Sequence, residues 1–191
     1  MKKILLSAAI AVLGFTQINA QNDDTISSSS ETTFGIKAGY SSVALKVSAD
    51  GAGSATEDLT GFYFGGFAEI NLSEKFALQP ELVFGNYSED GESSGVLLLP
   101  ILAKYKANEE FSLLAGPQFD YLTNEEDSEG LKRLGLGFTI GAAYDITENV
   151  ILDARYSFGL SDRFDSDIDE FEDFDIEARF SYFQIGLGYR F

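Results

Sequence analysis

The residues with the clearest potential for chemistry are carboxylates, because the 191-residue chain contains no cysteine and no histidine. They are densest in the segment 161–179, where aspartates stand at alternate positions. The candidate ligands there are Asp165, Asp167, Asp169 and Asp173. An EF-hand loop would need glycine at its sixth position and glutamate at its twelfth, and this segment has Glu170 and Ile176 instead. We therefore interpret it as a solvated acidic surface, with a divalent-cation site of another kind as the alternative.

A second group of charges recurs within segments in which apolar residues alternate with small or polar ones. Its members are Lys37, Glu69, Glu81, Lys104, Asp120, Asp145, Asp153, Arg155 and Arg190. Buried charges need partners because leaving water is costly. We expect these residues to pair in a network that fills an interior and fixes strand register. A narrow path for ions or protons is the alternative use of the same residues.

No catalytic constellation accompanies these charges. The chain has no histidine or thiolate to activate a nucleophile, and no other nucleophile–base pair is visible. The sequence thus predicts no enzyme, no catalytic residue and no cofactor. Its formal net charge of −18 also argues against a nucleic-acid partner, whose phosphates attract basic surfaces.

The elements that must position these residues are strands, because the dominant pattern from Phe34 onward has a period of two. The expected strands cover 34–44, 61–72, 76–87, 95–105, 111–122, 134–145, 150–160 and 181–191. Short connections alternate with longer acidic ones, which are 45–60, 88–94, 123–133 and 161–180. This spacing predicts an all-β, eight-stranded antiparallel up-and-down barrel. All three prolines, Pro80, Pro100 and Pro117, fall inside strands, where we expect bulges or irregular pairing.

The two faces of these strands differ strongly. One is apolar, carries no charge and has aromatic residues near both strand ends; the other holds the charges and most of the 19 glycines. An eight-stranded barrel is only just wide enough for side chains to fill, so the glycine-rich face belongs inside. Strands of this length and two aromatic girdles are typical of a transmembrane barrel. A soluble, lipocalin-like barrel with the apolar face inward is the alternative.

The amino terminus, MKKILLSAAIAVLGFTQINA, has the charged start, the apolar stretch and the small-residue end of a secretory signal peptide. We expect residues 1–20 to be cleaved, 21–33 to form a flexible polar lead, and 34–191 to form the barrel. The chain ends on YFQIGLGYRF, an alternating strand that closes on an aromatic residue.

Several motifs resemble those of the PorT-like outer-membrane β-barrel proteins of Bacteroidetes. They are Gln79-Pro80-Glu81-Leu82, Leu99-Pro100-Ile101-Leu102-Ala103-Lys104-Tyr105, Leu114-Ala115-Gly116-Pro117-Gln118 and the closing GLGYRF. The resemblance spans the mature chain and is most specific over 76–121. It implies an outer-membrane barrel of the OmpX/OmpA type whose last strand, with Tyr189 and Phe191, is read by the barrel-assembly machinery. Most members of the family have no defined activity.

Together these observations predict an outer-membrane barrel with a side-chain-filled lumen and acidic extracellular loops. We expect a structural or surface-interaction role, with outer-membrane lipid and lipopolysaccharide as its surroundings. An unidentified surface protein or polysaccharide is the expected partner, and divalent cations are a further candidate. The alternatives are a narrow ion or small-solute channel and an accessory component of an outer-membrane secretion system.

Overall fold

The computed structural model describes residues 32–49, 53–89, 92–123, 132–163 and 176–191. They form eight strands: β1 (Thr32–Ala49), β2 (Gly53–Asn71), β3 (Phe76–Glu89), β4 (Glu92–Lys106), β5 (Phe111–Leu122), β6 (Leu134–Asp145), β7 (Val150–Gly159) and β8 (Ile176–Arg190). Among the described residues there is no helix with the length and hydropathy to cross a membrane.

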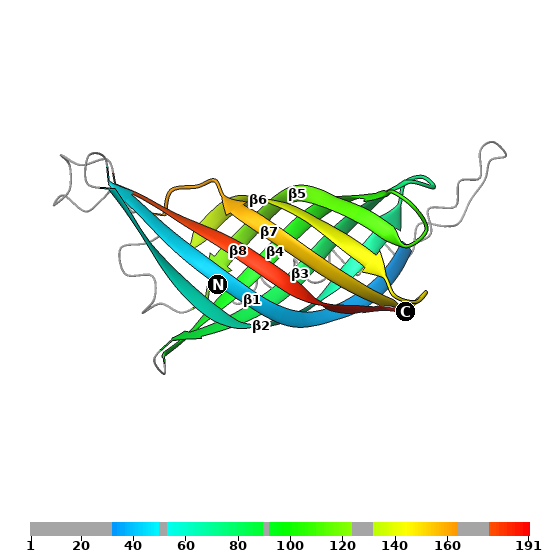
Figure 1. Cartoon of the computed structure of the whole chain (residues 1–191), viewed down its shortest axis with the longest axis horizontal. Coiled ribbons are helices and arrows are strands. Elements are labelled where there is room, and N and C mark those ends of the chain that lie inside the picture. Colours follow the sequence, from blue (N-terminus) through cyan, green and yellow to red (C-terminus); the bar gives the residue numbers. More distant parts are fainter. Residues whose placement is uncertain (1–31, 50–52, 90–91, 124–131, 164–175) are drawn as a thin grey trace, which may run out of the picture.

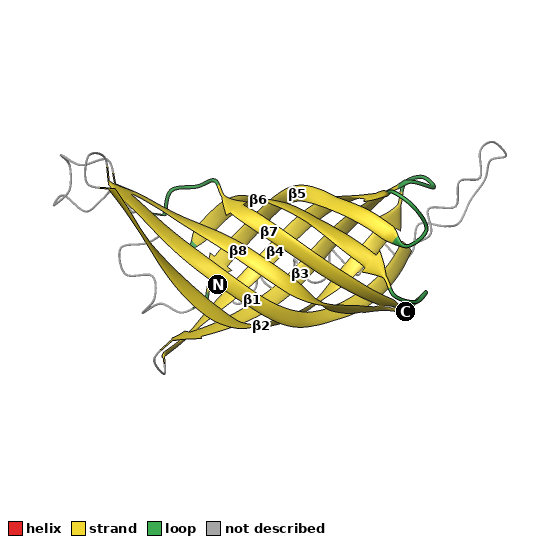
Figure 2. Ribbon diagram, viewed as in Figure 1, coloured by secondary structure: helices red, strands yellow, loops and turns green. Residues whose placement is uncertain are grey.

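The strands form a closed barrel in which each pairs antiparallel with its neighbours in sequence, and β8 closes against β1 (Figures 1 and 2). The predicted up-and-down barrel is therefore confirmed. Full closure removes the two sheet edges that an open eight-stranded sheet would leave unpaired. Three tight turns, 72–75, 107–110 and 146–149, define one end of the barrel, which we call the short-turn end. The opposite end is the long-loop end.

The predicted bounds are wrong at the long-loop end, where several strands continue further than expected. Residues 45–49 and 53–60 belong to β1 and β2, although the whole range 45–60 was predicted to be a loop. The predicted loop 88–94 is mostly strand, and β8 begins at Ile176 instead of residue 181. In β1 and β8 these extensions do alternate, but their apolar residues, such as Leu45 and Phe180, lie on the inward face, opposite to the rest of the wall. A strand pattern with its apolar residues on the outer face therefore stops before these strands end.

The three prolines interrupt the ladders without shifting them. Between β3 and β4 the pairs Pro80↔Ile101 and Val83↔Leu98 flank a gap, yet both belong to one register. The β4–β5 ladder has the same kind of gap between Pro100↔Gln118 and Ala103↔Ala115. Locally irregular pairing therefore occurs beside prolines, as expected from the missing N–H donor. A bulge would add a residue and change the register, and these ladders keep theirs.

The apolar face of the barrel points outward and the charged, glycine-rich face points inward. Large apolar side chains such as Phe62, Leu134 and Leu187 are more than half exposed, whereas Lys37, Glu81 and Arg155 are buried. The lipocalin-like alternative, which needs an apolar interior, does not fit this orientation. Exposed aromatic residues gather at both ends of the outer wall. They are Phe76, Tyr105, Phe111, Tyr144, Tyr189 and Phe191 at the short-turn end, and Tyr40, Phe62, Phe119, Tyr121, Phe158 and Phe183 at the other.

The expected signal peptide, residues 1–20, and most of the expected polar lead lie outside the described residues. Thr32 and Thr33, which the prediction assigned to that lead, already pair with Ile70 and Glu69 of β2. The four candidate cation ligands Asp165, Asp167, Asp169 and Asp173 also lie outside the described residues.

Candidate functional site

The lumen brings four charges from three strands into one buried cluster, the central quartet: Lys37 on β1, Glu81 on β3, and Asp153 and Arg155 on β7. Lys37 Nζ lies 2.6 Å from Asp153 Oδ2 and 3.4 Å from Glu81 Oε2. Arg155 Nη1 lies 2.8 Å from Glu81 Oε2, and its Nη2 lies 3.2 Å from Asp153 Oδ1. Each cation therefore contacts both carboxylates, and the quartet has no formal net charge.

Glycines on the neighbouring strands make room for these long side chains. Lys37 is paired with Gly65 on one side and Gly188 on the other. Arg155 is paired with Gly141, where an added Cβ would lie 2.8 Å from the Cβ of Arg155. Contacts this short are essentially absent from real structures. The glycines of the inner face therefore have a packing role, because they leave volume that the quartet fills.

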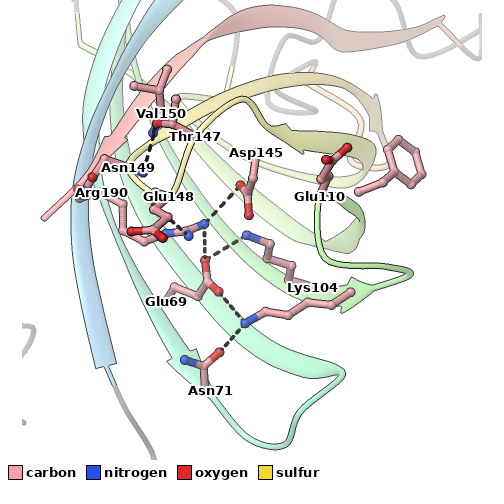
Figure 3. A network of polar contacts seen from close by, with 12 residues as sticks. Glu69, Asn71, Lys104, Glu110, Asp145, Thr147, Glu148, Asn149, Val150 and Arg190 are labelled. Atoms are coloured by element: carbon pink, nitrogen blue, oxygen red, sulfur yellow. Dashed lines mark hydrogen bonds and ion pairs between the residues drawn. The ribbon is translucent and has the colours of Figure 1, made fainter.

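A second charged cluster lies at the short-turn end and is centred on Glu69 of β2 (Figure 3). Its carboxylate lies 2.8 Å from Lys104 Nζ, 3.1 Å from Lys106 Nζ and 3.3 Å from Arg190 Nη2. The Arg190 guanidinium also reaches Asp145 Oδ1 at 3.3 Å. This cluster connects β2, β4, β6 and β8, so it links strands on opposite sides of the barrel.

Arg190 also takes part in closing the barrel. Its backbone N–H donates to the carbonyl of Asn149, and the Asn149 side-chain amide donates to the Arg190 carbonyl, at 2.7 and 2.9 Å. The next backbone N–H, that of Phe191, donates to the Phe34 carbonyl of β1 at 2.9 Å. The rings of Tyr189 and Phe191 lie on the outer wall with their centroids 5.7 Å apart.

A further buried basic residue, Arg163, was missed by sequence reasoning because it follows the end of β7, outside any alternating segment. Its guanidinium pairs with Asp120, donates to the Lys132 carbonyl at 2.9 Å, and lies 5.1 Å from the ring centroid of Phe180. The Tyr182 hydroxyl also donates to Asp120, at 3.2 Å. One signal was available: the predicted set had four basic and five acidic residues, so one acid needed a partner from elsewhere.

Neutral side chains fill the space between the charged clusters. Gln118 accepts from Thr139 and Ser157 at 3.2 and 3.0 Å, and the hydroxyls of Ser41 and Tyr87 lie 2.9 Å apart. Two apolar clusters complete the filling. One comprises Val43, Tyr63, Val83, Tyr87, Val96, Leu98, Leu122, Phe180 and Tyr182, and the other Phe67, Leu102, Leu114, Ala143 and Ile151.

This arrangement is suited to packing and to blocking the lumen. Within the described residues, no group of three or more acidic side chains is placed to hold a metal ion. Glu69, Glu81, Asp120 and Asp153 are each held by at least one cation from the lumen wall or the segment after β7. A carboxylate already held by a guanidinium or ammonium is poorly placed to abstract a proton from a substrate.

Comparisons with known proteins agree with this geometry. The sequence model of the family described as "Outer membrane protein beta-barrel domain" matches residues 19–165. Among solved structures, the attachment invasion locus protein Ail of Yersinia pestis is 17% identical, with a TM-score of 0.50 over 84% of this chain and 99% of that one. Neisserial surface protein A is 16% identical, with a TM-score of 0.50 and the same coverage. A search of curated proteins gives no match. At these identities the two structural likenesses speak for the fold alone.

Proposed function

The chain belongs to the family of outer membrane proteins with a β-barrel domain, and from this premise we propose that it is a closed barrel that presents its cell-surface strands and loops to other molecules. The short-turn end is then periplasmic and the long-loop end extracellular, as is usual for such barrels. In this arrangement the exposed apolar wall contacts lipid, and the lumen supports the wall without conducting.

The observation that carries the proposal is the central quartet. Its side chains are 6% exposed or less and reach from β1 and β3 to β7 across the lumen. An ion passing this level would have to displace a paired ammonium or guanidinium from two carboxylates, in a space with little water to compensate. Above and below the quartet, Asp120–Arg163 and the Glu69 cluster close the same lumen.

Planar-bilayer recording of the purified protein tests the closed lumen. We expect no single-channel steps above the detergent control. Regular steps would favour the alternative, a narrow ion or small-solute channel. They would contradict the proposal that side chains close the lumen. Cell fractionation should place the protein in the outer membrane, and its solubilisation should require detergent.

Finer assignments follow from the sequence motifs. We propose that the chain is PorT-like, on the basis of the Leu99–Tyr105 and Leu114–Gln118 motifs, and that residues 1–20 are removed on export. Amino-terminal sequencing of the mature protein should begin at Gln21. A role in secretion, as an accessory component, predicts that deleting the gene lowers the amount of exported protein in the medium.

The acidic surface suggests two further binding partners. Asp165, Asp167, Asp169 and Asp173 are proposed ligands for a divalent cation, which could also bridge to the phosphates of lipopolysaccharide. Calcium titration followed by the amide resonances of 164–175 tests this proposal, because specific binding would saturate at one equivalent. An enzymatic role is not proposed, since no nucleophile–base pair occurs among the lumen residues described above.

A further inference from the structure

A groove on the outer wall crosses the seam where β8 closes on β1. Its volume is about 450 Å³, within the range of roughly 300–1,000 Å³ that is typical of sites for small ligands. The outward-facing side chains that line it are Ile36, Ala38, Phe64, Val150, Leu187 and Tyr189. They come from β7, β8, β1 and β2, four adjacent strands that lie side by side in Figure 1.

The residue types at this seam explain why the wall is hollow here. Ala38 is paired with Phe64 of β2 on one side and with Leu187 of β8 on the other, so a small side chain lies between two large ones. One position earlier on β1, the Lys37 side chain is buried in the lumen, and both of its partners across the ladders are glycines. The backbone of these three strands therefore forms the floor of the groove, and large apolar side chains form its sides.

The groove rises through the wall from the short-turn end. Toward β7 it reaches Val150, the first residue of that strand, and Tyr189, which belongs to the aromatic girdle of the short-turn end. Toward β2 it reaches Phe64, two positions from Phe62 of the other girdle, and no described residue of that girdle lines it. Four strands spaced about 4.8 Å apart make the groove roughly 14 Å long. Because the strands of such barrels are tilted, this length runs obliquely through the membrane.

The surroundings and the shape of the groove both favour an acyl chain as its occupant. The family places the outer wall in the outer membrane, so lipid meets the barrel at this level. A convex wall contacts a chain from one side only, whereas the groove contacts it from below and from both sides, which adds dispersion attraction. Tyr189 supplies a polar contact, because the tyrosines of an aromatic girdle lie at the depth of lipid headgroups. A chain that enters beside Tyr189 belongs to a lipid of the periplasmic leaflet.

We propose that this groove holds one acyl chain of a phospholipid from the periplasmic leaflet, laid across the β8–β1 seam with its headgroup beside Tyr189. The chain contacts both closing strands at once, through Leu187 of β8 and through Ile36 and Ala38 of β1, and so favours the closed barrel. It is a single retained lipid, distinct from the exchanging lipid around the rest of the wall. The choice of leaflet rests on the orientation proposed above, whereas the site itself depends neither on the closed lumen nor on a surface partner.

Native mass spectrometry of the delipidated, folded protein in octyl tetraethylene glycol micelles tests the proposal, with palmitoyl-oleoyl phosphatidylethanolamine as the probe. We expect the first phospholipid to bind at least tenfold more tightly than the second, because one site on the wall differs from the rest. Dihexanoyl phosphatidylethanolamine has the same headgroup but chains too short to fill the groove. It should bind at least tenfold more weakly than the long-chain probe.

The position of the lipid is tested with the same phospholipid carrying a diazirine midway along one acyl chain. Cross-links to residues 36–38 and 187–189 should be at least fivefold more frequent than cross-links to residues 101–103 of β4, on another side of the barrel. Hexa-acylated lipid A, the lipid of the opposite leaflet, should lower labelling of the groove less than twofold at tenfold excess.

The matched variants are Ala38→Leu, which fills the groove without changing the inner face, and Ala103→Leu, which makes the same change on the outer face of β4. Ala38→Leu should weaken binding of the first phospholipid at least fivefold, and Ala103→Leu should leave it within twofold of the unsubstituted protein. Both should keep the heat-modifiable gel mobility of a folded barrel. Tyr189→Phe, which removes only the hydroxyl, should weaken binding about twofold.

Four outcomes would overturn the proposal: first and second phospholipids of equal affinity, unchanged binding to folded Ala38→Leu, cross-links spread evenly around the wall, or displacement of the probe by lipid A. Conductance does not depend on this groove, so failure here leaves the closed-lumen proposal standing.

Discussion

Lys37 and Asp153 are separated by 116 positions in the sequence, yet the ammonium of one lies 2.6 Å from the carboxylate of the other inside the barrel, where only β8 separates their strands. Both side chains are buried, and both take part in the central quartet with Glu81 and Arg155. The contact joins the first strand to the seventh, so it can form only after the chain has curled into a nearly complete barrel. It therefore couples the packing of the lumen to the closure of the wall.

Removing one member of this pair should destabilise the barrel more than removing both. Lys37→Met leaves Asp153 and Glu81 sharing one cation, and we expect a loss of about 3 kcal/mol in the free energy of unfolding. In the Lys37→Met/Asp153→Leu double variant the uncompensated charge is gone, and the loss should be smaller than that of Lys37→Met alone, hence well below the sum of the two single losses. The free energies of unfolding of the single and double variants are measured by denaturant unfolding in micelles, followed by far-ultraviolet circular dichroism. Strictly additive effects would contradict the coupling.

Thinning the quartet should open the lumen. Glu81→Ser/Arg155→Ser removes one acid and one base, so the formal charge is unchanged while two long side chains are lost. We expect small single-channel steps in planar bilayers from this variant and none from the unsubstituted protein. Leu99→Ala, on the outer wall, is the control and should remain silent. If the double variant is folded and also silent, the quartet is not the barrier.

Arg163 should anchor the segment after β7 without controlling conductance. Among the described residues, Arg163→Ala leaves Asp120 with the Tyr182 hydroxyl alone, and it releases the backbone that covers β8 at Ala178. We expect the Ala178 amide to exchange at least tenfold faster, while the bilayer current stays at the level of the unsubstituted protein because the quartet remains. Lys132→Ala, at an exposed neighbour, should change neither quantity. Conductance from Arg163→Ala would place the barrier at the long-loop end.

The β1–β8 seam should depend on a pair of facing glycines. Gly39 is paired with Gly186, and a Cβ at Gly39 would lie 2.5 Å from the Gly186 Cα, with the Ile185 carbonyl nearer still. Because backbone cannot move aside as a flexible side chain can, Gly39→Ala should cost about 1–3 kcal/mol or prevent closure. At Gly66 the nearest atom to an added Cβ lies 3.5 Å away, so Gly66→Ala is the matched control. The folded fraction of each variant is measured from the heat-modifiable gel mobility of the folded barrel. Equal folded fractions of Gly39→Ala and Gly66→Ala would contradict the packing argument.

The terminal aromatic should matter more for assembly than for the stability of the finished barrel. The Phe191 side chain is 70% exposed on the outer wall, where it contacts Tyr189. We expect Phe191→Ala to lower the amount of barrel assembled in cells several-fold. It should lower the denaturant midpoint of refolded protein no more than Phe111→Ala, another girdle residue, does. Equal assembly of the two variants would argue against a terminal signal at Phe191.

Most of the barrel wall could be predicted from the sequence, because within a membrane each strand has one face in lipid and one in the lumen. That difference imposes a period of two on the residue types, and the strands from β5 to β7 match their predicted bounds to within a residue. The extensions of β1, β2 and β8 at the long-loop end do not follow this pattern. In β1 and β8 the apolar residues there, such as Val43 and Phe180, lie on the inward face, so the alternation of the outer wall stops before the strands do. Backbone pairing with β1 holds the extensions of β2 and β8.

Arg163 shows the same limit within the lumen. Periodicity assigns a residue to a face only while it lies on a strand, and Arg163 lies beyond β7. Its position beside Asp120 depends on how the segment after β7 folds back over the long-loop end, where it bonds to Ala178.

The strand count, the order of the strands and the face that meets lipid can be predicted without coordinates, because they follow from local alternation and from the lengths of the connections. Which charges become partners, and how far the strands continue at the long-loop end, became visible only in the folded barrel. Those outcomes depend on the tilt and closure of the barrel, which bring together residues such as Lys37 and Asp153 from strands far apart in the chain.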